Sequence, residues 1–360
     1  MSGTFINPQR KVLAHLDRLG AWQYGLKPAP VTVEWDLSNR CYLGCQSCHF
    51  AHTHSRGPWA SRSRRLPMAF EQTGDLADLA MVRRGLGEMA KAGVQGVIWA
   101  GGGEPTTHPG WLEAVQAAST AGLEQGTYTA GGLLSQAQAA ELKRLASFVV
   151  VSLDAWNRET YLAEKAVDGF QRATDGLRWL AEADGQAVIG ASFLLHAGNW
   201  FDAFEMLLLA RRLGATYTTF RPTIEASPDH PAKCASDRGW ITTAMPVLQA
   251  LTSEPDVEID PARFRAYRDW NERSYAVCRG IQLVATVTPD GRVWICLQRR
   301  GIDGSSLGDL RQESFDTIWA RHPGQWTDFR DCRVMCRLHS LNEQINEVMA
   351  PRAQQHAAFV

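Results

Sequence analysis

Three cysteines near the start of the chain have the spacing of an iron–sulfur ligand set. Cys41, Cys45 and Cys48 form a C-x3-C-x2-C run. A [4Fe–4S] cluster normally takes four cysteine ligands, and the next cysteine in the chain is Cys234. One iron would therefore lack a protein ligand and could bind a small molecule. A zinc site completed by His49 or His52 is the alternative that the same thiolates allow.

A glycine-rich segment follows the second expected strand. Residues 101–105 read Gly-Gly-Gly-Glu-Pro, and glycines let the backbone approach a ligand closely. A Walker phosphate loop would end in Gly-Lys-Ser or Gly-Lys-Thr, and the segment does not. The segment is therefore either a tight turn or a loop whose carbonyl or carboxylate groups accept hydrogen bonds from an ammonium.

The elements that must position these groups alternate between strands and helices. Helices are expected between successive strands, which themselves are expected at 31–37, 94–100, 123–129, 148–152, 187–195 and 216–221. This alternation predicts a parallel sheet with right-handed crossovers. Six units are too few to close an eight-stranded barrel. We therefore expect an α/β fold of the partial (β/α)6 type. One of the crossovers is expected to be a single helix over 158–182.

A second cysteine set occupies the C-terminal part of the chain. It consists of Cys278, Cys296, Cys332 and Cys336. A β-hairpin is predicted from strands at 281–287 and 292–297 around the turn Pro-Asp-Gly at 289–291, and it brings the first two of these cysteines together. Four thiolates suit a closed [4Fe–4S] cluster or an all-cysteine zinc site.

Three regions follow from these patterns. Residues 1–30 form a lead-in, 31–255 the core barrel, and 256–360 a small C-terminal domain with a hairpin and a helix. The composition is that of an ordinary globular protein, with 360 residues, 45% hydrophobic residues and a net charge of −1. A net charge this close to zero gives no overall electrostatic attraction to nucleic acid or to a membrane surface. The N-terminus lacks the apolar core of a signal peptide, so we expect a cytoplasmic protein with reduced thiols.

The cysteine run, the glycine segment and the strand order resemble the radical S-adenosylmethionine (SAM) superfamily. The resemblance implies a partial TIM-like barrel in which the open iron binds the amine and carboxylate of SAM. Reductive cleavage of SAM then yields a 5′-deoxyadenosyl radical. The C-x12-G-x4-C spacing from Cys278 to Cys296 resembles a twitch domain, a shortened SPASM domain that holds an auxiliary [4Fe–4S] cluster. The x3 spacing of the last cysteine pair departs from the usual x2.

The resemblance also implies SAM contacts at the carboxyl ends of the strands. Helix caps and strand-end hydrogen bonds are the alternative roles for these side chains. Two departures affect the site: Ala130 replaces the family's usual Asn after the third strand, and Ser47 replaces an aromatic residue near the adenine. The residues implied to contact SAM are Gly101, Gly102, Gly103, Glu104, Pro105, Thr129, Ser152, Asp154, Ser192, His196 and Arg221.

The implied activity is hydrogen abstraction from a substrate, leading to oxidation (dehydrogenation or bond formation) of a small molecule while the auxiliary cluster takes an electron. The alternatives are an epimerase with Cys234 as hydrogen donor, a peptide-modifying enzyme, and a non-catalytic iron–sulfur or zinc module. Reduced flavodoxin or ferredoxin is the expected electron donor. The Arg- and His-rich segment 49–70 suits an anionic substrate such as a nucleotide, sugar phosphate or acidic peptide. It suits equally a solvated loop over the site or a docking surface for an acidic electron donor. The expected small molecule is a sugar, aminocyclitol or nucleotide-like compound.

Overall fold

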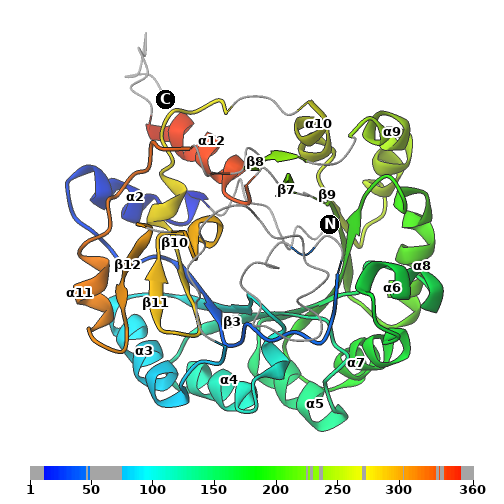
Figure 1. Ribbon diagram of the computed structural model, residues 1–360, viewed down its shortest axis with the longest axis horizontal. Helices are drawn as coiled ribbons and strands as arrows, with labels where there is room; N and C mark the ends of the chain where they lie inside the picture. The colour runs from blue at the N-terminus through cyan, green and yellow to red at the C-terminus, as the bar shows by residue number, and fades with distance from the viewer. Residues whose placement is uncertain are drawn as a thin grey trace.

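The computed structural model shows one strongly curved sheet that forms an open barrel, with helices on its outer side (Figure 1). It describes residues 12–45, 48, 75–223, 226–227, 230–234, 238–269, 273–302, 304–329, 332 and 336–349. None of the helices in these described residues combines the length and the hydrophobicity of a membrane-spanning segment.

The main sheet of the described residues has ten strands in the order β12-β11-β10-β1-β2-β3-β4-β5-β6-β9. Strands β1 to β6 are parallel to one another, as predicted. The strands of this sheet are β1 (Thr32–Asp36), β2 (Gly96–Ala100), β3 (Glu124–Thr129), β4 (Phe148–Ser152), β5 (Val188–Leu195), β6 (Tyr217–Pro222), β9 (Val257–Ile259), β10 (Val284–Val287), β11 (Arg292–Trp294) and β12 (Ser306–Asp309). A separate antiparallel pair consists of β7 (Ala226–Ser227) and β8 (His230–Cys234).

Helices connect successive parallel strands and cover the outside of the barrel (Figure 1). This arrangement confirms the predicted partial (β/α)6 barrel. The helices are α2 (Leu16–Gln23), α3 (Leu79–Ala92), α4 (Trp111–Thr120), α5 (Gln136–Leu145), α6 (Arg158–Lys165), α7 (Phe170–Glu182), α8 (Ala203–Arg212), α9 (Trp240–Leu251), α10 (Pro261–Asp269), α11 (Phe315–Trp319) and α12 (His339–Met349).

Alternation along β1 separates the hydrophobic core from the interior of the barrel. Val33 and Trp35 are fully buried in the main hydrophobic core, while Thr32 and Glu34 line an inner cavity. Gly85 of α3 lets the helix approach closely, since a Cβ there would lie 2.7 Å from the Trp35 ring. Period-two alternation in a strand thus gives the barrel an apolar outer face and polar inner positions.

The helix predicted over 158–182 is instead two helices. Helix α6 ends at Lys165 and is capped by Ala166, which adopts a left-handed conformation with φ 56°, and α7 begins after Gly169. The Asp168 and Gly169 pair favours a turn over a continuous helix. The break turns the carboxyl end of α6 towards the cysteine loop, where the Lys165 carbonyl accepts a hydrogen bond from Gly44 N at 2.9 Å.

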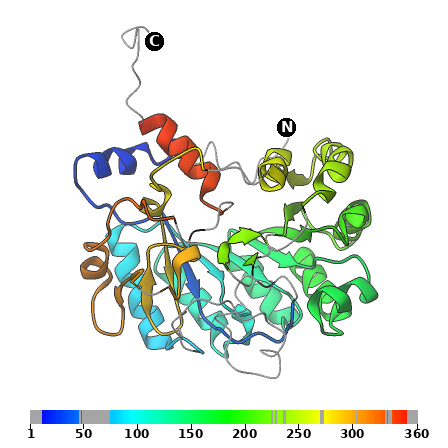
Figure 2. The same cartoon turned by 45° about the horizontal axis from the view of Figure 1, so that its top comes forward.

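The C-terminal hairpin extends the barrel sheet, because β10 pairs in parallel with β1. Figure 2 shows the gold and orange C-terminal strands beside the blue β1. The hairpin strands are shorter than predicted, since a 3-10 turn over Gly280–Gln282 precedes β10 and another over Leu297–Arg299 follows β11. On the opposite edge, β9 pairs with β6. The domain limits at 30 and 255 therefore stay predictions.

Candidate active site

The first cysteine set lies on the loop that leaves the carboxyl end of β1. Cys41, Cys45 and Cys48 are all partly exposed, and Cys48 N donates to Cys45 O at 3.3 Å. The loop thus carries three half-buried cysteines on the end of the barrel where parallel β/α folds bind ligands. Residues of this loop that lie outside the described part of the chain include Ser47, His49 and His52.

Burial raises the pKa of the Cys41 and Cys45 thiols. The Lys165 ammonium partly opposes this rise at Cys45. A metal that coordinates a thiol deprotonates it, so such thiols are neutral when free and thiolates when bound. The set therefore suits an iron–sulfur cluster better than it suits a free nucleophile.

The glycine segment is bound to the cysteine loop through the backbone. Gly103 N donates to Ser38 O at 2.9 Å, and Glu104 N donates to Arg40 O at 2.8 Å. A Cβ on Gly103 would lie 2.1 Å from the Arg40 carbonyl oxygen, so only glycine fits this approach. The glycine segment and the cysteine loop are therefore packed backbone to backbone. A side chain at position 103 would displace the cysteine loop from the glycine segment.

The Glu104 carboxylate joins the second and third strand ends. It accepts hydrogen bonds from Thr106 Oγ1 at 2.6 Å, Thr129 Oγ1 at 2.6 Å and Ala130 N at 2.7 Å. Thr129 Oγ1 also accepts from Gly131 N at 3.0 Å. Both side chains predicted to contact SAM are thus engaged with the protein, which leaves the backbone of the segment for a ligand.

Asp154 and Lys165 form a buried ion pair beside the cysteine loop. Their side chains are only 10% and 5% exposed, and Asp154 adopts a left-handed conformation with φ 57°. Asp154 Oδ1 also accepts from Leu194 N at 2.7 Å. Burial lowers the pKa of Lys165, but Asp154 and Cys45 more than compensate and raise it. Lys165 was not predicted, because a lysine in a helix is usually solvated.

The remaining predicted residues of β4 and β5 lie at neighbouring strand ends. Ser152 and Ser192 are register partners. His196 Nε2 donates to Glu164 Oε1 at 2.7 Å, and its Nδ1 accepts from Gly198 N at 3.0 Å. This pattern assigns the proton of a neutral His196 ring to Nε2. His196 is thus oriented by α6, next to the Asp154–Lys165 pair.

Arg221, predicted at the end of β6, points to the barrel interior and donates to the Tyr128 hydroxyl of β3. Burial raises the pKa of Tyr128, but the charges of Arg221 and Arg337 outweigh burial and lower it. Arg337 in turn forms an ion pair with the buried Glu34 of β1. Arg221 therefore belongs to a polar group that spans the inner side of the sheet.

A further ion pair, which sequence reasoning missed, connects the two cysteine regions. The fully buried Arg300 donates to Asp36 Oδ2 and, at 3.1 Å, to Gly101 O. Burial raises the pKa of Asp36 to about 7, although Arg300 opposes the rise. Arg300 lies four positions beyond Cys296, so the C-terminal region directly supports the glycine segment.

The second cysteine set surrounds one largely apolar cavity of about 390 Å³, which includes space open to solvent. Cys278, Cys296, Cys332 and Cys336 all line it, together with apolar side chains such as Trp326. Burial raises the pKa of Cys278, of Cys296 and, to about 12, of Cys336. Among the described residues, no three ligand side chains are arranged to hold a single metal ion. Four thiols around a shared cavity fit a cluster.

Polar side chains donate to the sulfurs of this set. Asn342 Nδ2 lies 3.1 Å from Cys278 Sγ, and Arg299 Nη1 lies 3.8 Å from Cys332 Sγ. The Asn342 carboxamide is fixed because its Oδ1 accepts from Arg279 N and Gly280 N, both at 2.7 Å. Donors to sulfur are among the groups that set the reduction potential of an iron–sulfur cluster.

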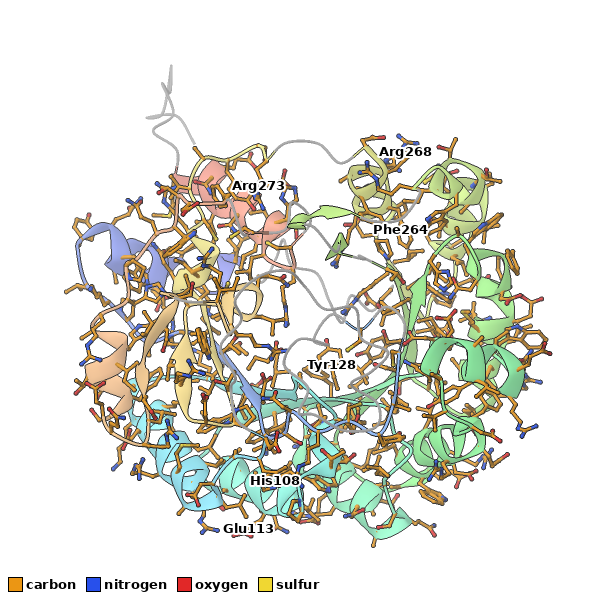
Figure 3. The ribbon with its side chains drawn as sticks, viewed as in Figure 1. His108, Glu113, Tyr128, Phe264, Arg268 and Arg273 are labelled. Atoms are coloured by element: carbon orange, nitrogen blue, oxygen red, sulfur yellow. The ribbon has the colours of Figure 1, made fainter. Side chains whose placement is uncertain are left out.

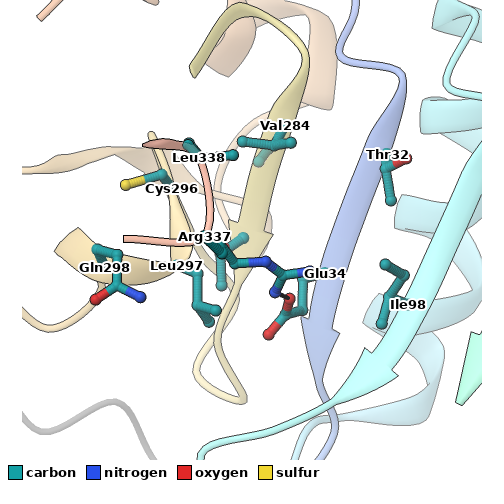
Figure 4. Close-up of a pocket in the computed structure, with 11 residues that line it drawn as sticks. Thr32, Glu34, Ile98, Val284, Cys296, Leu297, Gln298, Arg337 and Leu338 are labelled. Atoms are coloured by element: carbon teal, nitrogen blue, oxygen red, sulfur yellow. Dashed lines mark hydrogen bonds and ion pairs between the residues drawn. The ribbon is translucent and has the colours of Figure 1, made fainter. Parts of the chain in front are cut away.

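A second cavity lies inside the barrel, against the first. It encloses about 360 Å³, again with space open to solvent, and its wall includes Glu34, Ile98 and Arg337 (Figure 4). Cys296, Gln298 and Leu338 line both cavities. One cysteine of the second set therefore stands in the wall between the cluster cavity and the barrel interior.

Two predicted features cannot be placed in full. Cys234 ends β8, which pairs with β7, but its side chain lies outside the described part of the chain. The Arg- and His-rich segment 49–70 lies wholly outside it. The hydrogen-donor role of Cys234 stays a prediction.

Comparison with known families matches both halves of this arrangement. The radical SAM superfamily matches residues 35–210, and the SPASM iron–sulfur cluster-binding domain matches residues 278–344. The cysteine sets lie within these two ranges. The protein therefore has a SAM-binding [4Fe–4S] cluster, SAM itself and an auxiliary [4Fe–4S] cluster as its cofactors.

Individual relatives cover most of the chain. It is 26% identical over 318 residues to a PqqA peptide cyclase of Methylobacterium sp. (strain 4-46), which covers 82% of this chain and 74% of that protein. It is 22% identical over 313 residues to a probable GTP 3′,8-cyclase of Methanothermobacter thermautotrophicus, covering 81% and 95%. The solved structure of Streptococcus suis SuiB bound to S-adenosylmethionine shares the fold, with a TM-score of 0.62 at 14% identity over 87% of this chain and 70% of that one. The chain thus carries a radical SAM domain and a C-terminal SPASM iron–sulfur domain.

Proposed function

We propose that this protein oxidises a substrate inside the barrel, and that an electron from the substrate leaves through the C-terminal cysteine set. Cys41, Cys45 and Cys48 would hold the first cluster, whose open iron would bind SAM and whose electron would cleave it. The 5′-deoxyadenosyl radical released from SAM would then take a hydrogen atom from a C–H bond of the substrate. The observation that carries the proposal is the common wall of the two cavities, in which Cys296 takes part.

The wall explains how a two-electron oxidation could be completed. After the hydrogen atom is lost, the substrate must still release one proton and one electron. Cys296 offers the electron a short route, because its sulfur belongs to the cluster cavity while the residue lines the barrel cavity. Among the described residues lining the barrel cavity, Glu34 supplies the carboxylate. We assign Glu34 as the proton acceptor.

The strand-end residues are proposed to hold SAM as the family resemblance implies. The backbone of 101–105 would receive the SAM amine, because the Glu104 side chain is occupied by Thr106, Thr129 and Ala130. Ser152, Asp154, Ser192 and His196 lie at the same end of the barrel. The donor of the electron that cleaves SAM is proposed to be reduced flavodoxin or ferredoxin.

Two substrate classes are supported to different degrees. The cavity wall combines Glu34, Arg337 and Gln298 with apolar side chains, which suits a small molecule with charged groups. A peptide is the second candidate, because the chain resembles a PqqA peptide cyclase over 82% of its length. The similarity to a probable GTP 3′,8-cyclase supports a nucleotide-like molecule within the first class.

Anaerobic reconstitution tests the activity. With iron, sulfide, SAM and dithionite, we expect about eight irons per chain, from two four-iron clusters, and formation of 5′-deoxyadenosine. A matched pair of variants separates the roles of the clusters. Cys296→Ala should still cleave SAM but lose substrate oxidation, whereas Cys45→Ala should lose both. Absence of 5′-deoxyadenosine from the fully loaded wild-type protein would sink the proposal.

The mass of the product separates oxidation from epimerisation. Loss of two hydrogens supports oxidation, whereas unchanged mass with one deuterium taken from D2O supports an epimerase. In the second case, Cys234→Ala should abolish deuterium incorporation. If oxidation is correct, Cys234→Ala should leave the product mass and the yield unchanged.

A further inference from the structure

Three arginines from distant parts of the chain meet on the inner side of the barrel. Arg221 lies on β6 and donates to Tyr128, which Figure 3 places inside the barrel. Arg337 precedes α12 and pairs with Glu34. Arg263, in the first turn of α10, lies within electrostatic range of both other arginines. The three guanidinium groups thus surround one region between β1, β3 and β6.

The acidic groups described beside Arg337 and Arg263 leave much of the donor capacity of these two arginines unused. Glu34 is buried and engaged with Arg337. Asp260 is exposed at the start of α10, where its carboxylate accepts from Ala262 N at 2.9 Å. No hydrogen bond from the Arg263 side chain to another described residue is found, although a guanidinium has five N–H donors. Burial and the two neighbouring arginines lower the pKa of Arg263 to about 10.

We propose that Arg221, Arg263 and Arg337 form a binding subsite for an anionic oxygen group of the substrate, either a carboxylate or a phosphate. Guanidinium groups bind both through paired, charge-assisted hydrogen bonds. The subsite rests on the proposed function and assigns Arg221 to the substrate, not to SAM. Arg337 and Glu34 both line the barrel cavity, so the anionic group would anchor the substrate beside the wall that contains Cys296.

A competing role for these arginines is to balance the negative charge of the auxiliary cluster. Cys336 directly precedes Arg337 and lies within electrostatic range of Arg263. Another arginine already occupies that role more directly, because Arg299 points at Cys332 Sγ over the Trp326 ring, 4.3 Å from its centroid. The two roles predict different effects for the same substitution, so one set of variants separates them.

Isothermal titration of the reconstituted protein, saturated with SAM under anaerobic conditions, tests the subsite. The probes are inorganic pyrophosphate for a phosphate group and glutarate for a carboxylate. We expect at least one probe to bind, and the tighter one identifies the source of the anion. Arg263→Gln should weaken that probe by about tenfold or more, as expected for loss of a hydrogen bond to a charged group. Arg337→Gln should act in the same direction.

Arg268→Gln is the matched control, because Arg268 lies on the same helix but pairs with Asp269 at the surface (Figure 3). It should bind the probes as the wild type does. The subsite is overturned if neither probe binds, if Arg263→Gln binds the probe normally, or if that variant changes only the auxiliary-cluster signal or the SAM affinity. Formation of 5′-deoxyadenosine without substrate is measured on the same samples, so failure of the subsite is distinguished from failure of the proposed function.

Discussion

The two cysteine sets are held in the structure in different ways. Cys41, Cys45 and Cys48 lie on one short loop, partly exposed and held by backbone hydrogen bonds to the glycine segment. The C-terminal set gathers cysteines from 278 to 336 around a largely apolar cavity, with Asn342 and Arg299 directed at its sulfurs. The first arrangement leaves room for a ligand on iron, and the second fixes the sulfurs by packing and hydrogen bonds.

The two sets differ in what positions their sulfur atoms. A loop that must admit SAM cannot be packed on all sides, so its neighbours position it by backbone contacts. A buried electron carrier can be surrounded by packed side chains, and burial and hydrogen bonds to sulfur tune its potential. Arg300, which reaches from the second region to Gly101 in the first, joins the two.

The largest expected effect comes from removing the first set alone. Replacing Cys41, Cys45 and Cys48 by Ala should abolish 5′-deoxyadenosine formation. Iron content should fall only by about half, to about four per chain, because a second four-iron cluster remains. Iron analysis and chromatography of the reaction check both. Loss of all iron would show that the two sites do not assemble independently.

The next effect concerns the ion pair that joins the regions. Arg300→Met would leave the Asp36 carboxylate buried without its partner, and should lower the free energy of unfolding by about 3–5 kcal/mol. The control is the double variant Asp36→Leu with Arg300→Met, which removes both charges and should recover most of this loss. Urea denaturation monitored by tryptophan fluorescence measures it. Equal destabilisation of the single and double variants would contradict the account.

A smaller effect is the pH dependence of stability that comes from His322, a residue of the C-terminal region outside the cysteine set. Burial lowers the pKa of His322 to about 3, and its ring stacks on Trp319 with centroids 4.4 Å apart. Below its usual pKa near 6.5, His322 gains a proton in the unfolded state but not in the folded state. Stability should therefore fall as pH drops below 6.5, by up to about 1.4 kcal/mol per pH unit.

The His322→Gln variant tests that assignment. Its free energy of unfolding should depend less on pH between about 6.5 and 4 than that of the wild type. Denaturation curves at several pH values give the slope. The same slope in both proteins would mean that His322 is not the group responsible.

The smallest effect is on the potential of the auxiliary cluster. The hydrogen bond from Asn342 to Cys278 Sγ stabilises the reduced form of the cluster, because that form is the more negative one. Asn342→Leu removes this hydrogen bond. The potential should fall on the order of 20–60 mV, the equivalent of one net hydrogen bond for a one-electron couple. Asn346→Leu is the control, because Asn346 lies one turn further along α12 and donates to Val277 O instead. Redox titration followed by EPR compares them, and equal shifts would rule out the sulfur contact as the cause.

Local patterns could be predicted from the sequence because chain spacing itself sets the distances. The C-x3-C-x2-C run and the segment 101–105 are of this kind, as is the hairpin that brings Cys278 to Cys296. The family resemblance added the cofactors. The order of the first six strands was predicted from the periodicity of hydrophobic residues and from the turn residues between the elements.

Contacts between distant segments could not be predicted in this way. Asp36 and Arg300 are 264 positions apart, and nothing near either residue indicates its partner. Lys165 was missed because a lysine in a helix is usually solvated. The break after its helix, which Asp168 and Gly169 favour, was missed as well. The Glu104 and Thr129 side chains suit a ligand as well as each other, and only the three-dimensional arrangement shows that they bind each other.

EPR of the reduced, fully reconstituted protein, recorded with and without SAM, tests the division of roles most directly. We predict two [4Fe–4S] signals, of which only the one lost in Cys45→Ala shifts when SAM is added. The other should be unaffected by SAM and should change in Cys296→Ala. A shift of both signals with SAM, or a single signal in the fully loaded protein, would contradict the claim that one cluster is open to SAM and the other is closed.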